Sequence, residues 1–184
     1  AFPKKLSLYF SILNMLTRQL INVPVHLGLE HYPNIYCGVA VFLLYPLYVM
    51  DKDINLCEKI GKSVLLLVFL TAFNLNIPNF IWHGFHYPNS LPCRQSFIYI
   101  FFLLTMCYEA LSHIKRMTSR QLGIAVWISL GLLVLIEQVF AVDETYDFKA
   151  IYLSGAFILV YAGLMIVYNK TNWKLPVTVF LAFI

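Results

Sequence analysis

The sequence predicts an all-α protein, a polytopic bundle of transmembrane helices rather than a soluble domain. Hydrophobic residues make up 60% of the 184 residues and charged residues only 12%, whereas soluble proteins carry about 25% charged residues. A chain of this composition has too few polar side chains to face water on all sides. Its apolar residues are also grouped into runs close to the length of a membrane span, with short polar loops between them.

Residues 1–34 are predicted to form an amphipathic helix in the membrane interface and then an outer loop. Between Leu6 and Ile21, apolar residues recur at helical spacing and polar residues fall mostly elsewhere. This pattern is typical of a helix lying in the plane of the interface, where Lys4, Lys5 and Arg18 would meet anionic headgroups. The alternative is a helix packed on another part of the protein.

Residues 35–184 are predicted to form a transmembrane helical domain with about five full spans. The spans are expected at residues 35–50, 63–77, 97–111, 122–142 and 150–168. The shorter ones can reach the roughly 20 residues that a span needs by adding Tyr, Trp and loop residues at their ends. A truncated sixth span begins at Leu175. We therefore expect a fragment of a larger protein.

The basic residues predict which loops face the cytoplasm. Loops 51–62, 113–121 and 169–174 contain three, three and two Lys or Arg residues, whereas loops 82–96 and 143–149 contain one each. The two groups alternate along the chain, as successive loops of a multi-pass protein must. Because cytoplasmic loops are enriched in Lys and Arg, the first group is predicted to be cytoplasmic and the second to lie outside.

Several classes of function are not indicated by the sequence. No block of five or more Lys and Arg residues occurs, so nucleic-acid binding is not predicted. The cysteines form no CxxC pair, and none lies near a histidine at metal-ligand spacing; they are Cys37, Cys57, Cys93 and Cys107. The sequence therefore predicts neither a metal site nor a disulfide framework, and no cofactor is evident.

The outer loop 82–96 is the candidate binding site. Arg94 stands just before an apolar span, where a guanidinium can bind a phosphate through two hydrogen bonds. His83 and His86 could donate to the same phosphate or transfer protons. The alternative is that Trp82 anchors the chain in the interface and that Arg94 extends to lipid headgroups.

Polar residues within the apolar runs form a second group of candidates. Glu137 lies in the predicted fourth span, where a charge costs a few kcal/mol and should face other helices or water. It could pair with Arg94, bind a sugar hydroxyl or make a structural hydrogen bond. Asn74, Asn76 and Asn79 are predicted to form hydrogen bonds between helices.

Two segments resemble a known family. Residues 33–38, Pro-Asn-Ile-Tyr-Cys-Gly, resemble the PNxYxG segment of the bacterial YfhO-type membrane proteins. Residues 82–98, which read WHGFHYPNSLPCRQSFI, resemble their WHGFxxPN…PxRxSF segment. The order and separation of the segments also agree. The resemblance covers residues 30–112, and the later spans agree in hydropathy alone.

The resemblance implies a large multi-pass protein of the bacterial cell membrane with the fold of C-type glycosyltransferases. Such an enzyme would take a sugar from an undecaprenyl-phosphate carrier on the outer face and transfer it to a cell-surface polymer such as teichoic acid. The substrate-binding candidates are then Trp82, His83, His86, Asn89, Arg94 and Glu137. The catalytic base of such enzymes is usually an acidic residue in the first outer loop, which nothing here matches. Gln95 also departs from the aromatic residue common after the Arg.

Two other functions stay open at this point. A transporter or flippase of a lipid-linked precursor would need polar residues at mid-membrane, where this chain has mostly Leu, Val, Phe and Ile and Glu137 is the main exception. A non-catalytic membrane scaffold predicts that Arg94→Ala leaves sugar transfer intact.

Overall fold

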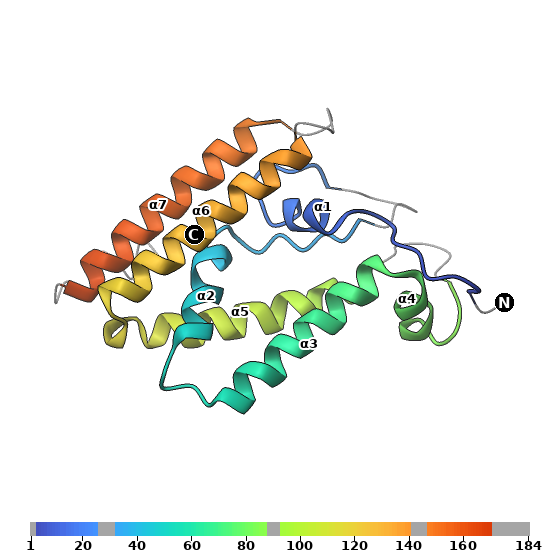
Figure 1. Ribbon diagram of the computed structural model, residues 1–184, viewed down its shortest axis with the longest axis horizontal. Coiled ribbons are helices and arrows are strands. Elements are labelled where there is room, and N and C mark those ends of the chain that lie inside the picture. The colour runs from blue at the N-terminus through green and yellow to red at the C-terminus, as the bar shows by residue number, and fades with distance from the viewer. Residues whose placement is uncertain (1–2, 26–31, 88–92, 141–146, 171–184) are drawn as a thin grey trace.

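The computed structural model describes residues 3–25, 32–87, 93–140 and 147–170. The regular secondary structure in these ranges consists of helices joined by loops (Figure 1). Within them the chain forms α1 (Ile12–Thr17), α2 (Val41–Met50), α3 (Leu56–Asn74), α4 (Asn76–Trp82), α5 (Ser96–Ser112), the 3-10 helix η1 (Ile114–Arg116), α6 (Ser119–Phe140) and α7 (Lys149–Lys170). The described residues include no strand, although Leu8 and Leu75 form an isolated antiparallel bridge. The predicted all-α class is confirmed.

Helix α2 is the central helix of the structure. It packs against α5 on one side and α6 on the other, while α6 and α7 run side by side (Figure 1). Leu43, Leu47 and Tyr48 are fully buried. Six of the ten residues of α2 are buried, as expected for a short helix that is apolar all round.

A proline inside α2 explains one of the contacts between α2 and α6. Pro46 has no amide hydrogen, so the carbonyl of Phe42, four residues earlier, loses its helical donor. The hydroxyl of Ser129 in α6 donates to this carbonyl oxygen over 2.7 Å. The bond satisfies a buried acceptor and fixes α6 against α2.

The number of full spans is smaller than predicted within the described residues. Two helices are long and apolar enough to cross a membrane, over Ser119–Gln138 and Lys149–Lys170. The segments predicted at 35–50 and 97–111 form the shorter helices α2 and α5. Helix α2 begins only at Val41 because the chain turns at Gly38, whose φ of 99° is a conformation that glycine adopts readily. Five full spans are therefore not confirmed.

The N-terminal segment differs from the helix predicted over residues 6–21. Only Ile12–Thr17 is helical, starting after the N-cap Ser11. The preceding residues are bonded to the junction of α3 and α4: the amide of Tyr9 donates to the Asn74 carbonyl and that of Asn76 to the Ser7 carbonyl. These tertiary hydrogen bonds replace helical ones, so the amphipathic spacing does not produce a helix here.

Asparagine side chains complete this attachment. The Oδ1 of Asn74 accepts from the amide of Phe10 at 3.1 Å, and the Oδ1 of Asn76 accepts from the amide of Ser7 at 2.9 Å. The Nδ2 of Asn79 donates to the Tyr9 hydroxyl over 3.2 Å. The asparagines do form tertiary hydrogen bonds as predicted, but their partners lie in the N-terminal segment and not in another helix.

Arg18 does not extend toward headgroups as predicted. Its side chain is buried, 4% exposed, and donates to the carbonyl oxygens of Pro24 and Pro33 and to Oδ1 of Asn34. The guanidinium also lies 5.8 Å from the centre of the Tyr32 ring. Backbone carbonyls and an aromatic face solvate the buried charge in place of water or phosphate.

Candidate functional site

The first part of the predicted outer loop follows directly on α4. Trp82 is the last residue of this helix and is partly exposed, with its ring edge-on to that of Phe69 at 5.1 Å between centroids. The Nδ1 of His83 lies 2.8 Å from the carbonyl oxygen of Asn79. Because a carbonyl only accepts, this bond places a hydrogen on Nδ1 and leaves Nε2 as the acceptor of the neutral ring.

The aromatic residues of the loop fix the path of the chain around His86. Phe85 and Tyr87 both pack on the buried Phe80, with ring centroids 6.2 Å and 5.2 Å away. Gly84 and Phe85 have φ values of 69° and 63°, so the chain turns sharply here. His86 lies between the two anchored rings and is exposed. The prediction of a loop after Trp82 is confirmed over these residues.

Arg94 lies in the turn that leads into α5. It is exposed, whereas its neighbours Cys93 and Gln95 are buried. Cys93 has a φ of 61°, and its thiol approaches the Phe73 carbonyl oxygen at 3.8 Å. The two buried neighbours hold the backbone of this turn in place, and the Arg94 side chain is at the surface of the protein.

The remaining candidates are less fully placed. Glu137 is half-buried in the last turn of α6. Asn89 lies outside the described residues. The predicted binding roles are not tested by the structure and stay predictions; they concern Trp82, His83, His86, Arg94 and Glu137.

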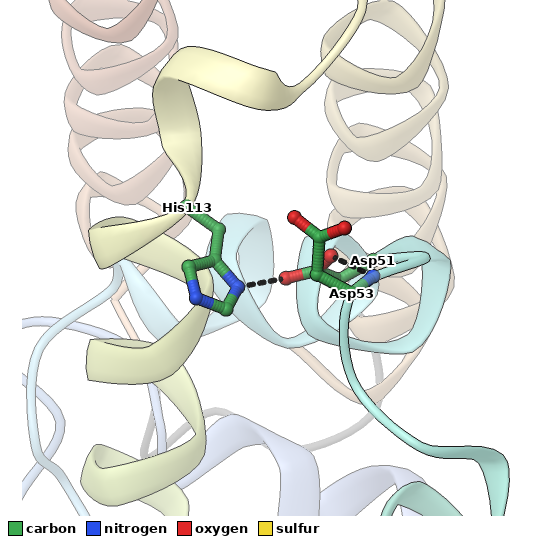
Figure 2. A group of neighbouring side chains, drawn as sticks. All are labelled: Asp51, Asp53 and His113. Atoms are coloured by element: carbon green, nitrogen blue, oxygen red, sulfur yellow. Dashed lines mark hydrogen bonds and ion pairs between the residues drawn. The ribbon is translucent and has the colours of Figure 1, made fainter.

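A second polar cluster was not foreseen from the sequence (Figure 2). Asp51 is the C-cap of α2 and is buried, and its Oδ2 lies 2.7 Å from Nδ1 of His113 at the end of α5. Its Oδ1 accepts from the amide of Asp53 at 2.9 Å. The two segments are 62 residues apart in the chain. The sequence pattern indicated only that their loops lie on one side of the membrane.

Basic residues balance the charge of this cluster. The Nη1 of Arg116 lies 2.7 Å from Oδ2 of Asp53, and this hydrogen bond holds the pKa of the Asp53 carboxyl below its usual range. Lys59 donates to the backbone carbonyl of Asp51. Lys62 pairs with Glu109 at 2.5 Å nearby. Asp51 thus connects the loop before α3 to the end of α5, Asp53 connects the same loop to η1, and Lys62 connects α3 to α5.

Asp51, Asp53 and His113 could also hold a metal ion. One ligand atom from each residue lies within 4.8 Å of the others, and carboxylate and imidazole are ligands for Mn²⁺ or Zn²⁺. Binding would require His113 to lose its bond to Asp51 and Arg116 to compete with the ion for Asp53. The existing bonds fit an ion network that joins two loops better than a metal centre.

The outer surface of the helices defines the class of protein. Large apolar side chains on α5, α6 and α7 are exposed, among them Phe101, Trp127 and Tyr152 at 65%, 78% and 68%. Only 28% of the most apolar stretch of α6 and 39% of that of α7 is buried inside the structure. A soluble core helix would be mostly buried, so these faces fit contact with lipid. The class is an α-helical membrane protein.

Comparison with known families identifies the group. The chain belongs to the family of the bacterial membrane protein YfhO, whose family model matches residues 4–184. The match extends beyond residues 30–112, on which the resemblance was based. Neither a curated protein nor a solved structure matches the chain.

Proposed function

We propose that the protein is part of a membrane glycosyltransferase that uses an undecaprenyl-phosphate-linked sugar and glycosylates a cell-surface polymer such as teichoic acid. The observation that carries the proposal is the exposed Arg94 in a turn anchored by buried neighbours, in a chain of the YfhO family. The guanidinium of Arg94 suits a phosphate, because its planar fork matches two phosphate oxygens.

The reaction defines what this site would have to supply. A hydroxyl oxygen of the acceptor forms a bond to the anomeric carbon of the sugar, and the bond from that carbon to the carrier phosphate breaks. The electron pair stays on the phosphate, whose growing negative charge Arg94 would stabilise. The proton of the hydroxyl needs a base. We place that base outside residues 1–184.

His83 and His86 would assist Arg94 in different ways. The Nδ1 of His83 is bonded to the carbonyl of Asn79, so the ring orientation is fixed and only Nε2 can face a ligand. His86 is exposed between two anchored rings and could donate to a phosphate oxygen. When protonated, each imidazolium would place a positive charge beside the phosphate leaving group.

The test is sugar transfer from undecaprenyl-phosphate-linked donors to cell-wall polymer, in membranes that contain the full parent protein. Arg94→Ala should lower transfer by about 100-fold or more, the range for removing one group that stabilises transition-state charge. Arg94→Lys keeps the charge but loses the planar fork, so it should recover only part of the activity.

Arg120→Ala is the matched control, since Arg120 is also exposed but stands at the start of α6, in a loop predicted to face the cytoplasm. It should leave transfer unchanged at an equal protein level. Equal transfer by Arg94→Ala and Arg120→Ala would show that Arg94 only contacts headgroups. No transfer by the intact parent protein would favour a transporter or a scaffold.

A further inference from the structure

The N-terminal segment lies against the helix that leads into the candidate site. Figure 1 shows this segment, in dark blue, passing the junction of α3 and α4. The amide of Tyr9 donates to the backbone carbonyl of Asn74 over 2.9 Å. This bond fixes the backbone of Tyr9, and it thereby restricts where the Tyr9 side chain can reach.

The Tyr9 hydroxyl reaches the helix that carries His83. It accepts a hydrogen bond from Nδ2 of Asn79 over 3.2 Å, although the two residues are 70 positions apart in the chain. Asn79 is fully buried, and its backbone carbonyl oxygen lies 2.8 Å from Nδ1 of His83. One residue of α4 therefore contacts both Tyr9 and His83. A shift of Asn79 would change the orientation of the imidazole.

The turn that contains Arg94 is attached at the same end of α3. The thiol of Cys93 approaches the carbonyl oxygen of Phe73 at 3.8 Å, and the carbonyl of the next residue, Asn74, accepts from the Tyr9 amide. The last carbonyls of a helix have no amide donor within the helix, so they are available to other segments. Two consecutive carbonyls of α3 thus hold the Arg94 turn and the N-terminal segment.

The surroundings of the Tyr9 hydroxyl also place it near both ends of the candidate loop. Burial raises the pKa of this hydroxyl, and Tyr87 and Cys93 lie near enough to raise the pKa further, against the opposite effect of the bond from Asn79. Tyr87 directly follows His86, and Cys93 directly precedes Arg94. The hydroxyl is therefore neutral at neutral pH and close to the backbone that carries both candidates.

We propose that Tyr9 is a positioning residue of the candidate site, whose hydroxyl acts through Asn79 to fix His83 relative to the Arg94 turn. The inference rests on the proposed function, because its consequence is how well these two side chains hold the carrier phosphate. Two groups bind one phosphate well only when their spacing is correct. Tyr9 would therefore govern the affinity for the lipid-linked donor and not that for the acceptor polymer.

Steady-state kinetics of Tyr9→Phe test the proposal, in membranes that contain the full parent protein. The KM for the undecaprenyl-phosphate-linked donor should rise roughly fivefold, the effect of one hydrogen bond, while the KM for the acceptor stays unchanged. A loss of folded protein would lower the maximal rate and leave both KM values as they are. Adding Tyr9→Phe to His83→Ala should raise the donor KM no further, because Tyr9 acts through His83.

Amide hydrogen exchange gives a readout that does not depend on sugar transfer. The amides of Gly84 and Phe85 close the end of α4 by donating to the carbonyls of Ile81 and Phe80. Exchange at these two amides should be roughly fivefold faster in Tyr9→Phe, because the last turn of α4 loses one of its attachments.

Tyr45→Phe is the matched control, since the Tyr45 hydroxyl is bonded to Ser63 at 3.1 Å and this bond joins α2 to α3 outside the candidate site. It should change neither the donor KM nor exchange at the end of α4. Equal values for Tyr9→Phe and Tyr45→Phe in both measurements would overturn the proposal. A further rise of the donor KM in the double variant with His83→Ala would do the same.

The exchange measurement also separates the proposal from the proposed function. Faster exchange in Tyr9→Phe, in a parent protein that transfers no sugar, would overturn the glycosyltransferase and support the attachment of His83 through Tyr9. Normal transfer by the parent protein with an unchanged donor KM in Tyr9→Phe would support the enzyme and overturn the role of Tyr9.

Discussion

Ser129 illustrates how a single hydroxyl can hold two helices together. Pro46 has no amide hydrogen for the Phe42 carbonyl, and the Ser129 hydroxyl donates to that carbonyl instead. Ser129 is fully buried. The same hydroxyl also lies 2.7 Å from the Ala125 carbonyl oxygen. That oxygen is in the interior of α6, where the helix itself offers a donor, so the bond to Phe42 is the one that matters for stability.

Ser129→Ala is therefore expected to destabilise the protein by about 1–3 kcal/mol, the cost of leaving a buried acceptor without a donor. Thr105→Val is the control, because the Thr105 hydroxyl makes a similar bond to the Phe101 carbonyl but is exposed. The measurement is the midpoint of denaturant unfolding in detergent. Similar midpoints for the two variants would contradict this role for Ser129.

At the residue scale, sequence reasoning succeeded where backbone chemistry decides the conformation. Residues 82–96 were predicted to form a loop, and the positive φ values at Gly84, Phe85 and Cys93 agree with it. The cluster of Asp51 and His113 could not be predicted, because its members are 62 residues apart and each loop alone has an ordinary mixture of charges. Such pairs depend on how the helices pack.

At the scale of elements, the N-terminal segment depends on the α3–α4 junction. Asn74 offers both its backbone carbonyl and its side-chain oxygen to this segment, and it is 3% exposed. Removing the side-chain oxygen would leave the Phe10 amide without its acceptor. The backbone bond from Tyr9 would remain, so the segment should loosen without detaching.

Asn74→Ala should consequently speed amide hydrogen exchange at Phe10 roughly fivefold, the equivalent of one hydrogen bond. Asn55→Ala is the control, since Asn55 is the exposed N-cap of α3 and its side-chain oxygen accepts from the amide of Cys57 in its own helix. Its effect should stay at the start of α3. Unchanged exchange at Phe10 in Asn74→Ala would show that the backbone bonds alone hold the segment.

The accuracy of the predicted elements follows the same physical logic. Helices α5 and α7 agree closely with the predicted runs 97–111 and 150–168, because a continuous apolar run between polar loops has few other stable conformations. The helix predicted over residues 6–21 is mostly absent, because tertiary hydrogen bonds from Asn74 and Asn76 override the local spacing. Periodicity gives no indication of such partners.

At the scale of the whole molecule, the exposed apolar faces of α6 and α7 determine where the protein resides. Trp127 projects from α6 and is 78% exposed. Water would solvate such a surface poorly, whereas lipid would not. The composition predicted this environment, but it could not fix the number of spans, since an apolar run such as 35–50 can also become the short buried helix α2.

Replacing Trp127 with Asp should impair membrane integration, because a carboxylate near the middle of a span costs about 2.5–3.5 kcal/mol on insertion scales. Trp127→Leu retains an apolar side chain and should integrate normally. The fraction of protein that resists alkaline extraction from membranes measures the difference. If Trp127→Asp integrated as well as Trp127→Leu, this face of α6 would be in contact with water.

The bonds that attach the N-terminal segment also impose an order on biosynthesis. The amide of Ser7 waits for a side chain 69 residues further along the chain. At a translation rate of about 5–20 residues per second, the delay before Asn76 is even synthesised is roughly 3–14 seconds. During that time the amides of Ser7 and Phe10 have to be solvated by water or headgroups. A ribosome paused before Asn74 would therefore carry a nascent chain whose early backbone has no native partner, although the residues themselves were made long before.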